Sequence, residues 1–169
     1  MTISIEILTE DNADVLKALV DDIGLDKDSD YVSRSVDKSV DKKRLVFIAR
    51  FDDQPAGFCM LNFEPAYAPF QKFDIPEMQD LNTHPDFRRR GVGGALIARC
   101  ESVAKEYGAT QLGLGVGLHA GYGNAHRLYV HKGFVPDGQG AVYDAVGVRA
   151  NDMLPLDDDL CLMMVKLLG

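Results

Sequence analysis

The sequence predicts a single α/β domain with a mixed, mostly antiparallel sheet flanked by helices. Its 169 residues suit one hydrophobic core, and no linker or internal repeat divides them. Segments with strand and helix patterns follow one another from Ile3 to Leu168. Their order is a strand, two helices, three strands, a helix, a strand, a helix and further strands. This order favours a mixed sheet covered by helices, so we expect one domain over residues 1–169.

The N-terminal segments predict one strand and two helices. Ile3–Ile7 alternates apolar and polar residues, as a half-buried strand does. Thr9 is a typical N-cap for a helix over residues 10–22, whose apolar residues share one face. Valines recur every fourth residue between Val32 and Val40, which indicates a second amphipathic helix.

The next segments predict a hairpin followed by an irregular loop. The apolar runs 45–49 and 57–61 are joined by the turn residues 52–55, a pattern typical of a β-hairpin. Residues 64–76 contain three prolines among Tyr67, Phe70 and Phe73. We expect no regular structure there, and we expect these aromatic side chains to be exposed or half-exposed.

The C-terminal half predicts a strand over Glu77–Thr83 and a strong helix over residues 91–107, which Gly108 ends. The helix carries apolar residues at Val92, Leu96, Cys100, Val103 and Tyr107. The remaining expected elements are a strand over Gln111–Val116, a short helix over Asn124–Lys132 ended by Gly133, and strands at Phe134–Val135, Val142–Tyr143 and Leu160–Leu168.

Composition excludes several classes of protein. The formal net charge is −8 and the pI about 4.9, which argues against a nucleic-acid binder. An acidic surface favours a cationic substrate, although it also simply maintains solubility. No apolar stretch is long enough to span a membrane, and no secretory signal pattern is present, so we expect a cytoplasmic protein without a membrane partner. Three scattered cysteines indicate a reducing compartment.

We expect no metal site. His126 and His131 are five residues apart on the expected helix and therefore do not share a face, so surface histidines are the simpler interpretation. The acidic run Asp157–Asp159 is typical of a solvated turn before the last strand.

The segment from Arg88 to Gly94 has the pattern of an anion site. A helix N-terminus offers unpaired backbone N–H groups and the positive end of the helix dipole. Glycine lets a phosphate approach those groups closely, and cations before the first turn strengthen the attraction. The segment that combines these features is Arg88-Arg89-Arg90-Gly91-Val92-Gly93-Gly94. The alternative is a solvated basic turn whose glycines serve helix packing.

Two other phosphate motifs are excluded. No G-x-x-x-x-G-K-S/T run exists, so there is no P-loop. The glycines of 113–117 lack the spacing of a dinucleotide fingerprint, and no helix begins at them. We expect these glycines to allow a bulged strand and the loop that follows it.

Arg88-x-x-Gly91-x-Gly93 after a strand resembles the Q/R-x-x-G-x-G/A motif of the GNAT acetyltransferase superfamily. The segment Asn124 to Phe134 is similar to that family's N-A-x-x-L-Y-x-x-x-G-F segment. The resemblance implies a single GNAT-like domain that binds the pyrophosphate of acetyl-CoA at this helix start. It covers nearly the whole chain, although only residues 77–134 carry specific motifs.

The resemblance also implies roles for single residues. Backbone groups of Leu81, Asn82 and Thr83 would receive the pantetheine arm, and Asn124 would touch the coenzyme. Tyr129 would donate a proton to the departing thiolate, for which a phenol is a suitable acid; the alternative is a core tyrosine. The implied contacts to acetyl-CoA comprise Leu81, Asn82, Thr83, Arg88, Arg89, Arg90, Gly91, Val92, Gly93, Gly94 and Asn124.

Glu77 is the candidate general base, because its offset before Arg88 resembles that of the catalytic glutamate in histone-type members. It would act directly or through water. Asp80 and Glu64 are other carboxylate candidates, but strand alternation places Asp80 on the face opposite Glu77. The alternatives are a surface role for Glu77 and a site that uses water alone.

These observations lead to three hypotheses. The first is an acetyl-CoA-dependent N-acetyltransferase acting on a primary amine of a small molecule, by direct attack in a ternary complex; the aromatic segment 64–76 favours it as a pocket lining. The second is a protein lysine or N-terminal acetyltransferase. The third is a catalytically silent CoA-binding module. A homodimer is compatible with each.

Overall fold

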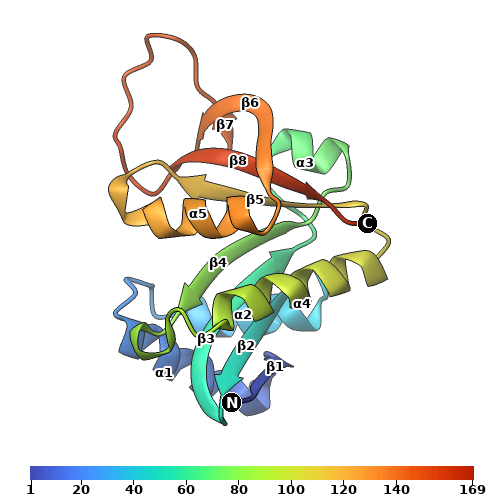
Figure 1. Cartoon of the computed structure of the whole chain (residues 1–169), viewed down its shortest axis with the longest axis vertical. Helices are drawn as coiled ribbons and strands as arrows, with labels where there is room; N and C mark the ends of the chain where they lie inside the picture. The colour runs from blue at the N-terminus through green and yellow to red at the C-terminus, as the bar shows by residue number, and fades with distance from the viewer. The chain divides into compact units, whose positions relative to one another are not determined.

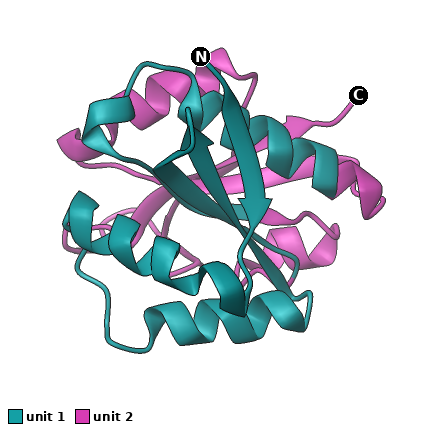
Figure 2. Ribbon diagram, turned by 90° about the horizontal axis from the view of Figure 1, so that it is seen from below, with its two compact units in different colours: residues 1–63, 78–103 teal, residues 64–77, 104–169 magenta.

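The computed structural model describes all residues from 1 to 169 and has an α/β fold with eight strands and flanking helices, as predicted. Its contacts divide the chain into two compact units (Figure 2). The first unit comprises residues 1–63 and 78–103, and the second comprises residues 64–77 and 104–169. None of the helices is both long and apolar enough to cross a lipid bilayer.

The first unit contains four neighbouring strands in chain order: β1 (Ile3–Ile7), β2 (Arg44–Phe51), β3 (Gln54–Asn62) and the greater part of β4 (Glu77–Thr83). β1 pairs with β2, and β2 with β3, in antiparallel register. Asp52 and Asp53 connect β2 to β3 with φ values of +46° and +66°, the left-handed backbone that two-residue hairpin turns require. The predicted hairpin is therefore confirmed.

Helices cover both faces of β2 and β3 (Figure 1). α1 (Ala13–Ile23) and α2 (Tyr31–Val40) bury one face, where Val46, Ile48, Phe58 and Met60 join their core. The alternate residues of the same strands meet α4 (Val92–Glu106): the Arg99 guanidinium lies 5.7 Å from the Phe47 ring centroid, and Cys59 Sγ lies 3.5 Å from Cys100 Sγ. The strict alternation of side chains explains this two-sided core.

The predicted helix after Thr9 begins differently from expectation. Residues Glu10–Asn12 form a 3-10 turn before α1, and the Thr9 N–H donates to Asn12 Oδ1 at 2.7 Å. The second predicted helix is confirmed as α2, with Val36 buried and Val40 exposed at its last residue.

α4 confirms the strong helix predicted after the arginines. Four of the five apolar residues predicted for its buried face are buried, whereas the fifth, Tyr107, lies beyond its end and is half-exposed. Gly108 has φ +85° and its N–H donates to the Lys105 carbonyl at 2.8 Å, so it ends the helix as predicted.

The second unit contains β5 (Gln111–Gly117), β8 (Leu160–Leu167), β6 (Val135–Tyr143) and β7 (Val146–Gly147), paired antiparallel in that order. The two short strands expected at 134–135 and 142–143 are the ends of one strand, β6. Its register with β8 breaks between Pro136 and Ala141. α5 (Gly123–His131) confirms the predicted short helix.

The prediction that residues 64–76 lack regular structure is wrong. Ala68–Lys72 forms the short helix α3, with Pro69 in its first turn. Proline is tolerated there because the first N–H groups of a helix have no intrahelical partner. The expected exposure holds only for Phe73, since Tyr67 and Phe70 are buried with an edge-to-face ring contact of 4.9 Å.

The glycine-rich strand β5 pairs with β8 without a register shift, so this pairing does not contain the expected bulge. Its glycines instead make room for rings. A methyl group at Gly113 would overlap the Phe70 ring, and one at Gly117 would overlap the Tyr122 ring. Gly115 lies on the same strand face, with the Met163 sulfur 3.1 Å from where a methyl group would stand.

Candidate functional site

The turn from Arg88 to Gly91 directs the chain from β4 into α4. A 3-10 turn over Pro85–Phe87 precedes it. Arg89 has φ +59°, and Gly91 has φ +92°, a conformation that a side chain would strain. The Ala95 N–H donates to the Gly91 carbonyl at 2.9 Å, so the helix starts where the sequence predicted.

The first N–H groups of α4 are therefore available to an anion. The N–H groups of Val92, Gly93 and Gly94 precede the first intrahelical bond, which Ala95 donates. Val92 turns its side chain into the core and is buried, whereas Gly91 is exposed and Gly93 and Gly94 are half-exposed. Exposed donors at the positive end of a helix fit a phosphate group.

The three arginines differ in their surroundings, although all are exposed. The Arg90 guanidinium lies over two rings, 5.5 Å from the Phe51 centroid and 5.8 Å from the Phe87 centroid. These cation–π contacts give Arg90 a role in the fold that the sequence pattern did not indicate. Arg88 and Arg89 are the two cations nearest the helix start without such a ring contact in the structure.

Leu81, Asn82 and Thr83 lie half-buried at the end of β4. β3 approaches this segment closely, because a methyl group at Gly57 would come within 2.5 Å of the Asn82 carbonyl oxygen. Asp80, just before them, has φ +49°. A left-handed residue interrupts the regular pleat of β4 at this point.

Asp80 is engaged within the protein. Its carboxylate accepts from Lys27 Nζ at 3.1 and 3.2 Å and from the Tyr31 hydroxyl at 2.9 Å. Burial, followed by the Asp80 charge, raises the pKa of Tyr31, so this phenol stays protonated as a donor. Both carboxylate oxygens are thus occupied by donors from Lys27 and Tyr31, so we do not propose Asp80 as the proton acceptor.

Glu77 belongs to the second unit and is buried, with 9% of its surface exposed. The Gly113 N–H donates to the carbonyl of the preceding Pro76 at 2.9 Å. The alternative of a plain surface position for Glu77 is therefore wrong. Glu64, by contrast, is exposed.

Acidic groups gather around Cys161 in the second unit. Burial first, and then the charges of Asp159, Glu77, Asp158 and Asp157, raise the pKa of Cys161 to about 11. Glu77 thus shares its surroundings with the acidic run that precedes β8. The acidic run is not merely solvated, because two of its carboxylates accept hydrogen bonds from tyrosines. The Tyr143 hydroxyl donates to Asp157 at 2.9 Å and the Tyr122 hydroxyl to Asp158 at 3.0 Å.

Tyr129 is a buried residue of α5. Its ring meets Phe134 edge-on with 6.0 Å between centroids, and its carbonyl accepts from the Phe134 N–H at 3.0 Å. Asn124 is exposed in the first turn of the same helix. The two residues thus lie on one short helix, buried and exposed respectively.

His119 and His126 are half-exposed, and each contacts an oxygen of another residue. His119 Nε2 lies 2.8 Å from Asp158 Oδ1, and His126 Nε2 lies 2.7 Å from the Gly117 carbonyl oxygen. No group of three or more His, Cys, Asp or Glu side chains lies close enough to hold a metal ion.

The predicted site residues divide between the two units. Leu81–Thr83 and Arg88–Gly94 belong to the same stretch of the first unit, residues 78–103. The second unit contains Glu77, Asn124 and Tyr129. Sequence reasoning missed the partners of Asp80 and the acidic surroundings of Cys161. The contacts of Asp80 with Lys27 and Tyr31, and the effect of Glu77 on Cys161, join residues far apart in the chain, for which no local pattern exists.

Comparison with known proteins gives the family. Solved structures with the same fold include a GNAT-family protein from Desulfovibrio desulfuricans (16% identity, TM-score 0.74, 99% of this chain and 100% of that chain). The ribosomal-protein-alanine N-acetyltransferase of Brucella melitensis is 20% identical (TM-score 0.71; 98% and 99%). The PaiA N-acetyltransferase of Thermoplasma acidophilum, solved with coenzyme A, is 17% identical (TM-score 0.66; 99% and 99%).

No curated protein sequence matches the chain. The family model described as acetyltransferase (GNAT) family, however, matches residues 12–134, which is most of the chain. This match spans the turn before α4 and the whole of α5. The chain therefore belongs to the GNAT acetyltransferase family.

Proposed function

We propose that this protein transfers an acetyl group from acetyl-CoA to a primary amine of a small molecule, by direct attack within a ternary complex. The observation that carries the proposal is the start of α4. Exposed arginines lie there next to backbone N–H groups that precede the first intrahelical hydrogen bond. The chain also belongs to a family of acetyltransferases.

On the donor side, we assign most of the contacts to acetyl-CoA to residues of the first unit. The N–H groups of Val92, Gly93 and Gly94 would bind the pyrophosphate, with Arg88 and Arg89 supplying opposite charge. The backbone of Leu81–Thr83 would hold the pantetheine arm as an added strand is held. Asn124, exposed on α5 of the second unit, would touch the coenzyme. Acetyl-CoA supplies the activated acyl group as its thioester.

On the acceptor side, Glu77 would take a proton from the amine, directly or through water. The amine nitrogen then bonds to the acyl carbon, the carbon–sulfur bond breaks, and Tyr129 would donate its hydroxyl proton to the departing sulfur. The burial of both side chains supports these roles, because a proton donor and acceptor shielded from bulk water keep their orientation.

The cysteines support direct attack rather than an acyl-enzyme. Cys59 and Cys100 are fully buried against each other. Cys161 is half-buried, and its pKa of about 11 leaves little thiolate at neutral pH. Since the thiolate is the nucleophilic form, none of the three is suited to carry an acetyl group.

The acidic groups that act on Cys161 support an amine acceptor better than the aromatic residues of segment 64–76 do. Tyr67 and Phe70 are core residues, so they do not line an open pocket. The carboxylates of Glu77, Asp158 and Asp159 instead create a negative potential around Cys161, which favours a small cationic amine. A protein substrate is the second candidate; the Brucella enzyme acetylates a ribosomal protein according to its name, but its 20% identity supports only the fold.

The deciding experiment incubates the full chain with acetyl-CoA and a panel of acceptors, and follows release of free thiol. The panel contains diamines, polyamines, amino acids, aminoglycoside-type compounds, lysine-containing peptides and peptides with free N-termini. We expect turnover with small amines and less than about a tenth of that rate with peptides, a difference of roughly 1.4 kcal/mol in transition-state binding.

Other outcomes separate the alternatives. Turnover with peptides alone would support a protein acetyltransferase. Saturable thermal stabilisation by acetyl-CoA without thiol release, for every acceptor, would indicate a CoA-binding module. If acetyl-CoA gave no thermal shift at all, the donor assignment would be wrong.

A further inference from the structure

Asp80 adopts a backbone conformation that its position in a strand does not favour. It lies in the middle of β4 with φ +49°, in the left-handed region that most residues avoid. Aspartate tolerates this region better than most residues but still requires compensation from its surroundings. The distortion stands directly before Leu81–Thr83, so it sets the direction of that segment.

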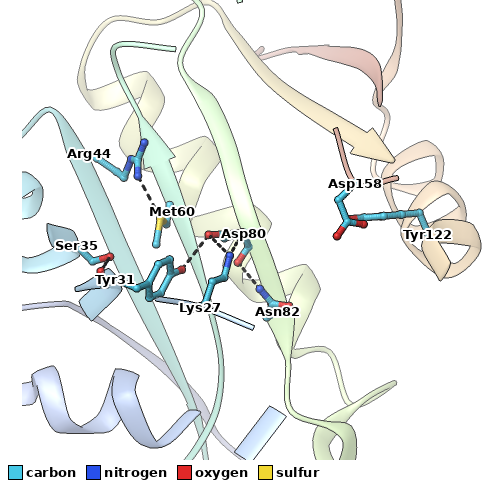
Figure 3. Close-up of polar contacts among 9 residues, drawn as sticks. All are labelled: Lys27, Tyr31, Ser35, Arg44, Met60, Asp80, Asn82, Tyr122 and Asp158. Carbon is cyan, nitrogen blue, oxygen red and sulfur yellow. Dashed lines mark hydrogen bonds and ion pairs between the residues drawn. The ribbon is translucent and has the colours of Figure 1, made fainter. Parts of the chain in front are cut away.

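The compensation comes from the region that joins α1 to α2 (Figure 3). Lys27 Nζ contacts both carboxylate oxygens of Asp80, at 3.1 and 3.2 Å, and the Tyr31 hydroxyl donates to Oδ2 at 2.9 Å. The Lys27 ammonium also lies 4.8 Å from the centroid of the Tyr31 ring. We call these three side chains, Lys27, Tyr31 and Asp80, the Asp80 clamp.

The clamp is shielded enough to be effective. The side chains of Lys27 and Asp80 are only 25% and 33% exposed, so solvent screens their attraction less than it screens a surface pair. The pair Arg34–Asp28 in the same region offers a contrast. Its atoms are closer, at 2.7 Å, but the side chains are 50% and 62% exposed and touch nothing on β4.

The backbone after Asp80 is fixed from two further directions. The Asn82 side-chain amide donates to the Asp80 carbonyl at 3.1 Å. On the β3 side, the space at Gly57 admits the Asn82 carbonyl at a distance that a side chain would forbid. The His84 N–H donates to the Ala56 carbonyl at 2.9 Å. The clamp therefore adds side-chain restraints to a segment that is also held through its backbone and Asn82.

We propose that the Asp80 clamp is a positioning device for the acyl donor: Lys27 and Tyr31 hold the distorted turn of β4 so that the backbone of Leu81–Thr83 receives the pantetheine arm. The inference rests on the proposed function. Lys27 and Tyr31 are positioning residues in this account, because they act on the donor only through Asp80.

The test measures steady-state kinetics, CoA affinity by titration calorimetry and thermal unfolding for five variants. Lys27→Met and Tyr31→Phe each remove one donor to the carboxylate, and Asp80→Asn removes its charge while keeping a residue that tolerates the left-handed conformation. Lys27→Arg is the conservative variant. Arg34→Met is the matched control, since it breaks an ion pair of the same region that does not touch β4.

We expect Lys27→Met, Tyr31→Phe and Asp80→Asn to raise the KM for acetyl-CoA and the Kd for CoA by about fivefold to tenfold. This is less than the roughly tenfold to 100-fold effect of a lost hydrogen bond to a charged group, because the clamp acts on the donor only through Asp80. The KM for the amine should change less than twofold. Lys27→Arg and Arg34→Met should keep both constants within about twofold of the wild type.

Lower melting temperatures with an unchanged KM for acetyl-CoA would overturn the proposal, because a merely structural role moves only stability. Equal losses in Arg34→Met would overturn it as well. If Lys27→Met does not fold, Tyr31→Phe, which removes one oxygen atom, decides the question. Failure of the proposed function itself is distinguishable, because the wild-type chain would then release no thiol with any small amine, whether or not it binds CoA.

Discussion

The two units present opposite charge at their candidate sites. In the first, Arg88 and Arg89 are exposed beside the N–H groups that open α4. In the second, burial and then the charges of Glu77 and of the acidic run before β8 raise the pKa of Cys161. A backbone-built anion site thus belongs to one unit and a side-chain-built acidic site to the other. This division matches a reaction whose donor is a polyanion and whose acceptor is a cation.

The division predicts a kinetic separation. Changes in the second unit should lower turnover and leave CoA affinity intact, and changes at the start of α4 should do the reverse. The following variants are ordered from the largest expected effect to the smallest.

Tyr129→Phe removes the proposed proton donor to sulfur, and we expect kcat to fall about 10³-fold, within the usual range for general acid catalysis. CoA affinity, measured by calorimetry, should stay within about twofold, because the ring and its contact with Phe134 remain. Tyr107→Phe, at a half-exposed tyrosine, is the control. A large loss of CoA affinity at unchanged kcat would refute the acid role.

Glu77→Gln should lower kcat/KM for the amine about 10²-fold, less than the tyrosine change because solvent water also accepts protons. The deficit should shrink as pH rises, since more of the free amine is then already deprotonated. A pH–rate profile with saturating acetyl-CoA measures this, with the exposed Glu106→Gln as control. A deficit of constant size across the profile would contradict a proton-accepting role.

Arg88→Ala should raise the KM for acetyl-CoA about tenfold and leave kcat at saturation within about twofold. The wild-type KM should also increase with salt, and more steeply than that of the variant, because the screened charge is missing from the variant. Lys105→Ala, at an exposed cation in the last turn of α4, is the matched control. A fall in kcat without a change in KM would break the proposed separation.

Gly91→Ala places a side chain at φ +92° and should lower the free energy of unfolding by about 1–2 kcal/mol, measured by urea denaturation. Gly123→Ala is the control: its φ is −56° and nothing lies within 4 Å of the added methyl group, so we expect a change below about 0.5 kcal/mol. Equal effects at both positions would show that the turn does not require glycine.

Cys161→Ser should leave kcat within about twofold of the wild type, since no acyl-enzyme is expected. The folded state raises the pKa of this thiol from 9.0 to about 11, so the neutral form persists until the pH approaches that value. At pH 8 the thiolate fraction is about 100-fold below that of an unperturbed cysteine, and alkylation by iodoacetamide should be correspondingly slow. Complete loss of turnover would indicate a covalent route.

The start of α4 was predictable because the physical requirement is local. The site needs a helix N-terminus, a residue with positive φ and room for an anion to approach the backbone. All three requirements concern neighbouring residues, and they are met in the short segment around Gly91. The same local logic predicted the hairpin turn at Asp52–Asp53 and the end of α4 at Gly108.

The remainder depended on contacts that no local pattern contains. Three prolines predict irregular structure over residues 64–76, but Pro69 lies in the first turn of α3, where a helix tolerates proline. The burial of Glu77 and the distortion at Asp80 arise from partners distant in sequence, such as Lys27. Acid–base catalysis depends on such contacts between residues far apart in the sequence. The catalytic roles therefore stay proposals, whereas the anion site has a defined geometry.

The glycines of β5 have a consequence for how this chain varies in sequence. The Phe70 ring fills the space that a side chain at position 113 would need. The Tyr122 ring does the same at Gly117. A larger residue at either glycine is accommodated only when the ring opposite becomes smaller, because a packed core has no spare volume. Each glycine and its ring should therefore covary among related chains, so that an alanine at 113 accompanies an aliphatic residue at 70.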